Sequence, residues 1–218
     1  MDQYIKVPHQ ITDKSFNIIS DEIKELDPTF QFQTPLQEDI IKRAIHTSAD
    51  FDYLKNLVFT GKAEIIVQEV IKQGGHIITD TNMALAGINK KILDQYGCHY
   101  HCFVNDERAF KISEEKGITR SMASIQLASQ LEGPKVYVIG NAPTAIYQIL
   151  ESVEAGKFEI EAVIGVPVGF VGAAESKKAL HESEIPSIAA LGRKGGSNVA
   201  AAIVNAIQYN IKGIIHQH

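Results

Sequence analysis

Apolar residues recur at helical spacing through the first 60 residues of the chain. The stretch "ITDKSFNIISDEIKEL" carries them at near-helical intervals, at Ile11, Phe16, Ile19, Ile23 and Leu26. A second helical stretch, "LQEDIIKRAIHTSA", follows two prolines that interrupt the pattern. The spacing therefore predicts a helical extension over residues 1–60.

The hydrophobic pattern changes from residue 61 onward. The short apolar runs "HIITD", "CHYHCFV", "KVYVIG", "EAVIGVPVG" and "PSIAAL" are each followed by a helix-like segment. Strands that alternate with helices through short connections form parallel sheets covered on both faces. We therefore expect an α/β fold, a three-layer α/β/α sandwich with a mostly parallel sheet of about five strands. One domain spans residues 1–218, with the extension at 1–60 and the α/β core at 61–218.

Composition and charge narrow the function classes. The chain has 218 residues, 44% of them hydrophobic and 22% charged, which is typical of a globular protein. A formal net charge of −5 argues against a nucleic-acid partner. No apolar run approaches the roughly 18 residues of a membrane span. Two cysteines and an N-terminus without a secretion pattern indicate a cytoplasmic protein with no disulfide framework.

One stretch, "GCHYHCF" at residues 97–103, superficially resembles a metal site. It contains Cys98, His99, His101 and Cys102. If the stretch is a strand, its side chains alternate between two faces, so these four groups do not converge on one ion. No second cysteine or histidine pair with ligand spacing completes a tetrahedral site. We therefore predict no protein-bound metal.

Glycine-rich segments follow the predicted strands. They read "TDTNMALAG", "GNAPTA", "GVPVGFVGAAES" and "LGRKGGSNV". Ligands of open parallel sheets bind outside the carboxyl ends of the strands, and helix N-termini there favour anions. None of these loops has the glycine spacing of a dinucleotide or P-loop site. Tight turns alone would also use glycine, but several such loops together favour a large anionic ligand. Candidate contacts are Gly169, Gly172, Arg193, Gly195, Gly196 and Ser197.

His46 lies near the end of the second predicted helix, outside its two apolar rows. Arg43 precedes it by three residues, on the same polar side. Two interpretations remain open. His46 is a solvated surface histidine, or it faces the ligand cleft as a proton donor or acceptor. A nearby arginine depresses the pKa of a histidine unless an anionic ligand offsets the charge.

The segments discussed above resemble the precorrin-8X methylmutase family of cobalamin biosynthesis. The matching segments are "KSFNII", "IKRAIHT", "ITDTNMALAGI", "GITRSMA", "VIGNAPTA", "GVPVGFVGAAESK" and "LGRKGGSNVAAAIVNA", in order over nearly the whole chain. The resemblance implies an isomerase that moves a methyl group from C11 to C12 of a tetrapyrrole. It also implies an α/β/α homodimer without S-adenosylmethionine or nucleotide. Any cobalt belongs to the substrate, precorrin-8X or cobalt-precorrin-8.

The resemblance also assigns roles to individual residues. His46 matches the catalytic histidine of the family and Arg43 a substrate-binding arginine. Ser15 matches a substrate-binding hydroxyl position, and Arg120 an arginine that holds a ring carboxylate. Relatives often carry a glycine near Ala49, so the loop after His46 departs from the family pattern. Two alternatives remain open: a non-catalytic tetrapyrrole carrier, and a nucleotide-dependent Rossmann enzyme, against which the missing glycine fingerprint counts.

Overall fold

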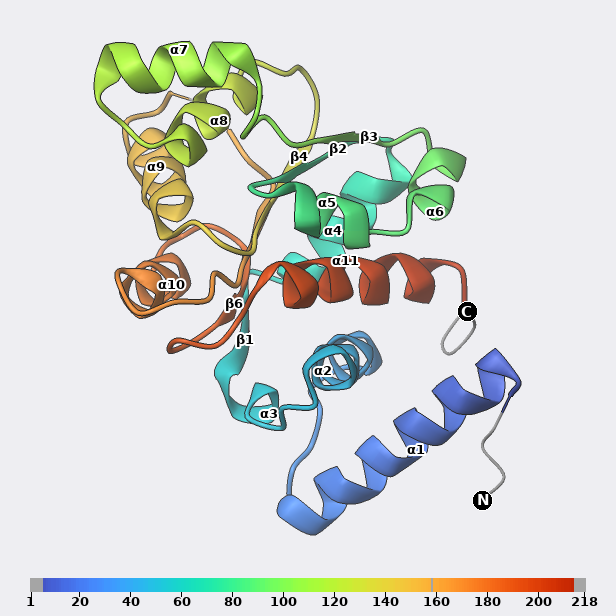
Figure 1. Cartoon of the computed structure of the whole chain (residues 1–218). Helices are drawn as coiled ribbons and strands as arrows, with labels where there is room; N and C mark the ends of the chain where they lie inside the picture. The colour runs from blue at the N-terminus through green and yellow to red at the C-terminus, as the bar shows by residue number, and fades with distance from the viewer. Residues whose placement is uncertain (1–5, 158, 214–218) are drawn as a thin grey trace.

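A computed structural model describes residues 6–157 and 159–213. Residues 1–5 and 214–218, at the two ends of the predicted domain 1–218, lie outside this range, and with them the first half of the N-terminal stretch used to argue against a secretion signal. A mixed sheet runs through the molecule, and helices cover both of its faces (Figure 1). No helix in the described part of the chain is long and apolar enough to cross a membrane.

The elements follow one another in a regular α/β order. The strands are β1 (Leu57–Thr60), β2 (His76–Thr79), β3 (His99–His101), β4 (Lys135–Ile139), β5 (Ala162–Gly165) and β6 (Ser187–Ala190). The N-terminal helices are α1 (Pro8–Leu26), α2 (Pro35–Ser48) and α3 (Tyr53–Asn56). The remaining helices are α4 (Ala63–Lys72), α5 (Asn82–Gly87), α6 (Lys90–Gln95), α7 (Glu107–Lys116), α8 (Arg120–Ala128), α9 (Pro143–Glu154), α10 (Ala173–His181) and α11 (Ser197–Ile211).

The six strands lie in the order β1-β6-β5-β4-β2-β3. Every neighbouring pair is parallel except β1 and β6, which are antiparallel. This confirms the predicted α/β class and the mostly parallel sheet. The sixth strand, β1, falls within the stretch predicted as helical extension. Its sequence "LVFT" has only four residues, too few to show a period, and it directly follows the helical turn of α3.

Alternating side chains of the central strands divide the core between the two faces of the sheet. Val136 and Val138 of β4 pack in one cluster, with buried residues of α2, α4 and α11. Tyr137 and Ile139 of the same strand pack in the other, with residues of α8, α9 and α10. A strand buried on both faces reads as a continuous apolar run, which is why "KVYVIG" stood out in the sequence.

Two N-terminal helices add a further layer on the α11 side. Helix α2 packs along α11, and α1 lies across the outside of α2 (Figure 1). The apolar rows predicted for α2 are buried, with Ile40 and Ala44 fully enclosed. Its N-terminus is capped by Thr34, whose hydroxyl accepts a hydrogen bond from the Gln37 amide at 3.1 Å. The packing places the last turn of α2 beside the first turns of α11.

Candidate active site

His46 lines a cavity of about 220 Å³ between α2, α5 and α11. The cavity is lined by Arg43, His46, Thr47, Gly87, Asn198, Ala201, Ala202 and Asn205. His46 is solvent-exposed, whereas Arg43 is only 8% exposed. The two polar groups that the sequence placed on one side of α2 therefore meet in one cleft, with the imidazole accessible to a ligand.

Aromatic rings hold both groups in place. The ring of Phe16, from α1, stacks on the His46 imidazole with centroids 5.2 Å apart and an interplanar angle of 26°. The Arg43 guanidinium lies 5.2 Å from the centroid of Phe16 and 4.8 Å from that of Tyr209. Helix α2 thus contributes two groups to the stack, and α1 and α11 contribute one ring each. A cation over an aromatic face is favourable, more so when it is shielded from water.

The surroundings of His46 favour its neutral form. Partial burial lowers the pKa of His46 below 6.5, and the positive charge of Arg43 lowers it further. A neutral imidazole offers one N–H donor and one nitrogen acceptor at neutral pH. The group can therefore both give and take a hydrogen bond at a ligand atom.

The end of α2 places His46 through a left-handed cap. Ala49 follows the helix at φ 54° and ψ 31°, and its amide donates to the Ile45 carbonyl at 2.7 Å. Glycine adopts this left-handed conformation more readily than other residues, but Ala49 adopts it here. The helix therefore ends in an intact left-handed cap without a glycine.

The glycine-rich loops after β5 and β6 are bonded to each other. The Gly196 amide donates to the Val166 carbonyl at 2.8 Å, and the Gly169 amide donates to the Arg193 carbonyl at 3.1 Å. A Cβ on Gly195 would lie 2.1 Å from the Val166 carbonyl oxygen. Close backbone approach is therefore the reason for glycine at position 195.

A buried lysine supports the loop after β6 from its inner side. Lys177 of α10 is fully buried, and its ammonium donates to the Lys194 carbonyl at 2.7 Å. Burial lowers the pKa of Lys177 to about 8. On the outer side, the Lys194 ammonium pairs with Asp50 at 2.7 Å and Asp52 at 2.6 Å. These contacts tie the loop after β6 to both α10 and the segment that follows α2.

Asp80, at the end of β2, organises the loop after β4. Its buried carboxylate accepts the backbone N–H groups of Gly140, Asn141 and Ala142 at 2.7 to 2.8 Å. Next along the chain, the Thr81 hydroxyl lies 2.8 Å from that of Ser197. Asp80 therefore braces the loop after β4.

These contacts form a continuous rim along the C-terminal edge of the sheet. The Asn198 amide donates to the Thr47 carbonyl at 3.5 Å, which joins α11 to the end of α2. Further along, the Thr144 hydroxyl of α9 lies 3.0 Å from that of Thr119, the residue before Arg120. Helices α9, α10 and α11 all begin on this rim without a side-chain cap hydrogen bond. Their first N–H groups face the region where anions bind in such folds.

The candidate residues occupy different places on this rim. Arg43 and His46 line one cavity, and Ser197 adjoins it at the start of α11. Arg193 is exposed and stacks over Phe170, at 5.3 Å from the ring centroid. Arg120 lies further away, at the start of α8, a helix that covers the other face of the sheet. Its guanidinium stacks over Phe110 at 4.8 Å.

Ser15 lies outside the cavity. Its hydroxyl donates to the Ile11 carbonyl of its own helix at 2.8 Å. Gly169 and Gly172 border a projecting loop whose tip exposes two large apolar side chains, Phe170 at 82% and Val171 at 91%. Apolar side chains this exposed, next to a charged rim, suit contact with the flat face of a ligand.

Sequence analysis missed much of the cavity wall. Asn198, Ala201, Ala202 and Asn205 follow the i, i+3, i+4, i+7 spacing of one helical face. That stripe of small and amide side chains was the available signal, but it identifies a face without saying which helix covers it. Phe16 and Tyr209 were missed for the same reason, since an aromatic residue in an apolar row is ordinarily core.

The histidines of the 97–103 stretch lie on β3, the outermost strand at the end of the sheet opposite β1. His99 and His101 share a face, as expected for a strand, and His76 of β2 stacks against both rings. His76 Nδ1 lies 3.0 Å from His101 Nε2. Among residues 6–157 and 159–213, no group of three or more His, Cys, Asp or Glu side chains is arranged to hold a metal ion.

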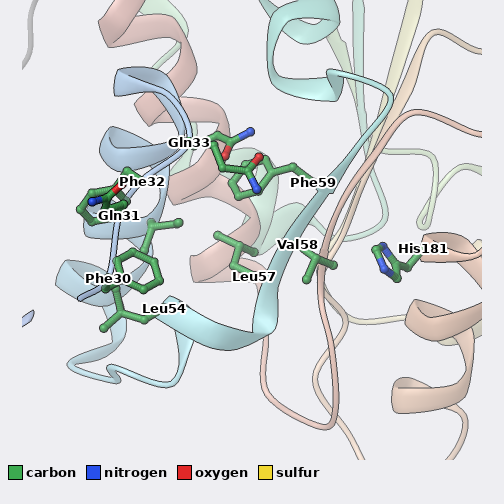
Figure 2. A pocket seen from close by; sticks show the side chains of 11 residues that line it. Phe30, Gln31, Phe32, Gln33, Leu54, Leu57, Val58, Phe59 and His181 are labelled. Carbon is green, nitrogen blue, oxygen red and sulfur yellow. The ribbon is translucent and has the colours of Figure 1, made fainter. Parts of the chain in front are cut away.

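A second cavity, of about 300 Å³, lies beside the free edge of β1 (Figure 2). It is lined by Phe30, Gln31, Phe32, Gln33, Gln37, Ile41, Leu54, Leu57, Val58, Phe59 and His181. Figure 2 shows the segment 30–33 on one side of β1 and His181 on the other. Although this cavity is the larger, its lining is mostly apolar and amide, without a paired cation and base. The His46 cavity is therefore the better candidate for acid–base chemistry.

A mostly parallel sheet, with a histidine and an arginine in a cleft beside the helix that follows its last strand, is typical of an α/β enzyme. A family model described as precorrin-8X methylmutase matches residues 10–210. The chain belongs to the precorrin-8X methylmutase family, whose members are isomerases. The resemblance drawn from the sequence motifs is thereby confirmed.

Individual relatives agree with the family model. The chain is 50% identical to the cobalt-precorrin-8 methylmutase of Salmonella typhimurium over 210 residues, which cover 96% of this chain and 98% of that protein. It is 34% identical to the precorrin-8X methylmutase of a Sinorhizobium species, with 94% and 95% covered. The solved structure of precorrin-8X methylmutase from Thermus thermophilus is 29% identical, with a TM-score of 0.81 over 93% of this chain and 98% of that one.

Proposed function

We propose that this methylmutase moves a methyl group from C11 to C12 of precorrin-8X or cobalt-precorrin-8, with hydrogenobyrinate or cobyrinate as the product. The observation that carries the proposal is the His46–Arg43 pair in a cleft that opens onto a rim of helix N-termini. A tetrapyrrole with several carboxylates needs such a rim, because free N–H groups and arginines bind carboxylates well.

His46 acts as the proton donor or acceptor. The methyl group leaves one ring carbon and bonds to the neighbouring carbon of the same macrocycle, so the reaction needs no external methyl donor. What the enzyme supplies is a fixed substrate geometry and one preferred tautomer. The neutral His46 imidazole forms a hydrogen bond to the nitrogen of ring C and biases that tautomer.

The rim residues bind the periphery of the substrate. Arg43 offers its accessible edge inside the cleft, and Arg193 and Arg120 provide charge further along the rim. The hydroxyls of Ser15 and Ser197 and the backbone around Gly172 and Gly195 supply hydrogen-bond partners, while the amides of Gly169 and Gly196, which donate to the Arg193 and Val166 carbonyls, keep these loops in place. The exposed tip of Phe170 and Val171 covers the flat face of the ring.

Three further properties belong to the proposal. The enzyme has no resident cofactor, because the methyl group is already on the substrate and any cobalt enters with it. It acts as a homodimer, as the family resemblance implies, which sedimentation of the purified protein tests directly. It works in the cytoplasm, consistent with its two unpaired cysteines, Cys98 and Cys102.

The test compares wild type with His46→Ala, with precorrin-8X and with its cobalt form, by the absorbance of the corrin product. We expect wild type to convert substrate, and the variant to bind the product but to lose about 10²- to 10⁴-fold in turnover. His9→Ala, at an exposed histidine of α1, is the matched control and should retain full turnover. Equal turnover in His46→Ala and wild type would remove His46 from the mechanism. A wild type that binds product without forming it would make the protein a carrier.

A further inference from the structure

Phe16 is the one residue of α1 whose ring stacks directly on His46. It is 4% exposed, although most of α1 faces solvent. Its ring lies 5.2 Å from the His46 ring at an interplanar angle of 26°, and 5.2 Å from the Arg43 guanidinium. One side chain from a separate helix therefore contacts both groups of the proposed site.

The contacts of Phe16 limit the positions that His46 and Arg43 can take. His46 belongs to the last turn of α2 and is exposed, so a contact from another helix helps to select its rotamer. The Phe16 ring covers one face of the imidazole. On the Arg43 side, Phe16 and Tyr209 together hold the guanidinium, so the charge stays near His46.

We propose that Phe16 is a positioning residue of the methylmutase, whose ring fixes the His46 imidazole and the Arg43 guanidinium in the arrangement that the methyl shift requires. This inference rests on the proposed role of His46. Small displacements of a catalytic group cost large factors in rate, and packing against the group is the usual means of preventing them.

The same contacts shape the protonation of His46. Burial is the larger cause of its lowered pKa, and Arg43 is the charged group that adds to it. The other side chains that the cavity brings to His46, Thr47, Asn198 and Asn205, are uncharged. Replacing the Phe16 ring by a smaller side chain admits water and releases Arg43, and both changes move the pKa of His46 upward.

The experiment uses Phe16→Leu in the full-length protein, with Ile23→Ala as the matched control. Ile23 is equally buried on the same helix, two turns further on, and no ring contact or charge links it to His46. Both variants loosen α1, but only the first removes the ring from the site. The readouts are the His46 pKa in the ligand-free protein, from the imidazole proton resonances, and kcat and KM for the methyl shift.

We expect Phe16→Leu to raise the pKa of His46 and to lower kcat by roughly tenfold to a hundredfold with a smaller change in KM. Phe16→Tyr, which keeps the ring, should restore most of kcat, and Ile23→Ala should leave both readouts near wild type. If Phe16→Leu and Ile23→Ala behave alike, the inference is overturned while His46→Ala can still be inactive. If His46→Ala turns over normally, the proposed role of His46 fails instead. The pKa of His46 in Phe16→Leu still shows whether the Phe16 ring affects the imidazole.

Discussion

At the scale of single residues, we expect the pair Arg43–His46 to make turnover depend on pH. In the proposed mechanism the reaction uses the neutral His46 imidazole, and both burial and the Arg43 charge lower the pKa of His46 below 6.5. Activity should therefore be constant above pH 6.5 and fall only as the pH drops through the lowered value. We predict that Arg43→Gln moves this acid limb of the kcat/KM profile to higher pH, because one of the two causes of the lowered pKa is gone.

The measurement is the pH profile of kcat/KM for both proteins, with the thermal unfolding of each recorded at the same pH values. The lower absolute activity expected from a lost substrate contact does not affect the position of the limb. An acid limb at the same pH in both proteins would mean that Arg43 does not act on the protonation of His46.

The residue scale also shows how far sequence reasoning reaches. His46 and Arg43 were singled out because they depart from the apolar rows of their own helix. Phe16 could not be recognised in the same way, because it obeys the apolar row of α1 and its role depends on which helix α1 meets. Spacing describes one helix at a time, whereas the Phe16–His46 stack joins residues 30 positions apart on two helices.

At the scale of elements, the loops after β5 and β6 depend on one close backbone approach. Gly195 has φ 155°, and a Cβ there would lie 2.1 Å from the Val166 carbonyl oxygen. We predict that Gly195→Ala lowers the free energy of unfolding by about 3 kcal/mol or more, through backbone strain and steric overlap together. Because the two loops would separate, turnover should fall as well.

Gly192→Ala provides the matched control for this substitution. Gly192 belongs to the same loop and has φ 83°, but no atom lies within 4 Å of the added Cβ. It should cost about 1 kcal/mol, from strain alone, and leave turnover nearly unchanged. Urea unfolding and the corrin assay on both variants measure the difference. Equal losses in the two would show that the close approach to Val166 contributes nothing.

The same loops show what the sequence reveals about elements. Their glycines marked the C-terminal edge of the sheet, and the structure places them there. Whether a glycine is present for a ligand or for a neighbouring backbone depends on distances that no pattern contains. Strand β1 was missed because four residues carry too little periodicity, and its pairing with β6 bridges about 130 positions along the chain.

At the scale of the whole molecule, two of the most extensive contacts between the N-terminal stretch and the α/β core are made by β1 and α2. Strand β1 pairs with β6 and so covers an edge of the sheet, while α2 packs along α11. The buried side chains Ile40, Ala44 and Ile45 of α2 belong to the same cluster as the core of α11. The boundary at residue 60 that the sequence suggested therefore marks a change in the hydrophobic pattern. It does not separate two independent cores.

We predict that a variant lacking residues 1–60 loses the cooperative thermal unfolding of the full chain. Removal of residues 1–60 exposes the edge of β6 and the apolar side of α11. An open strand edge beside exposed apolar surface favours aggregation. A variant that begins at Thr34 keeps α2 and β1 and should still unfold cooperatively. It should nevertheless be nearly inactive, because it lacks Phe16. Thermal melts followed by circular dichroism and the corrin assay distinguish the two variants. A cooperative melt of the variant lacking residues 1–60, near the midpoint of the full-length protein, would contradict the prediction.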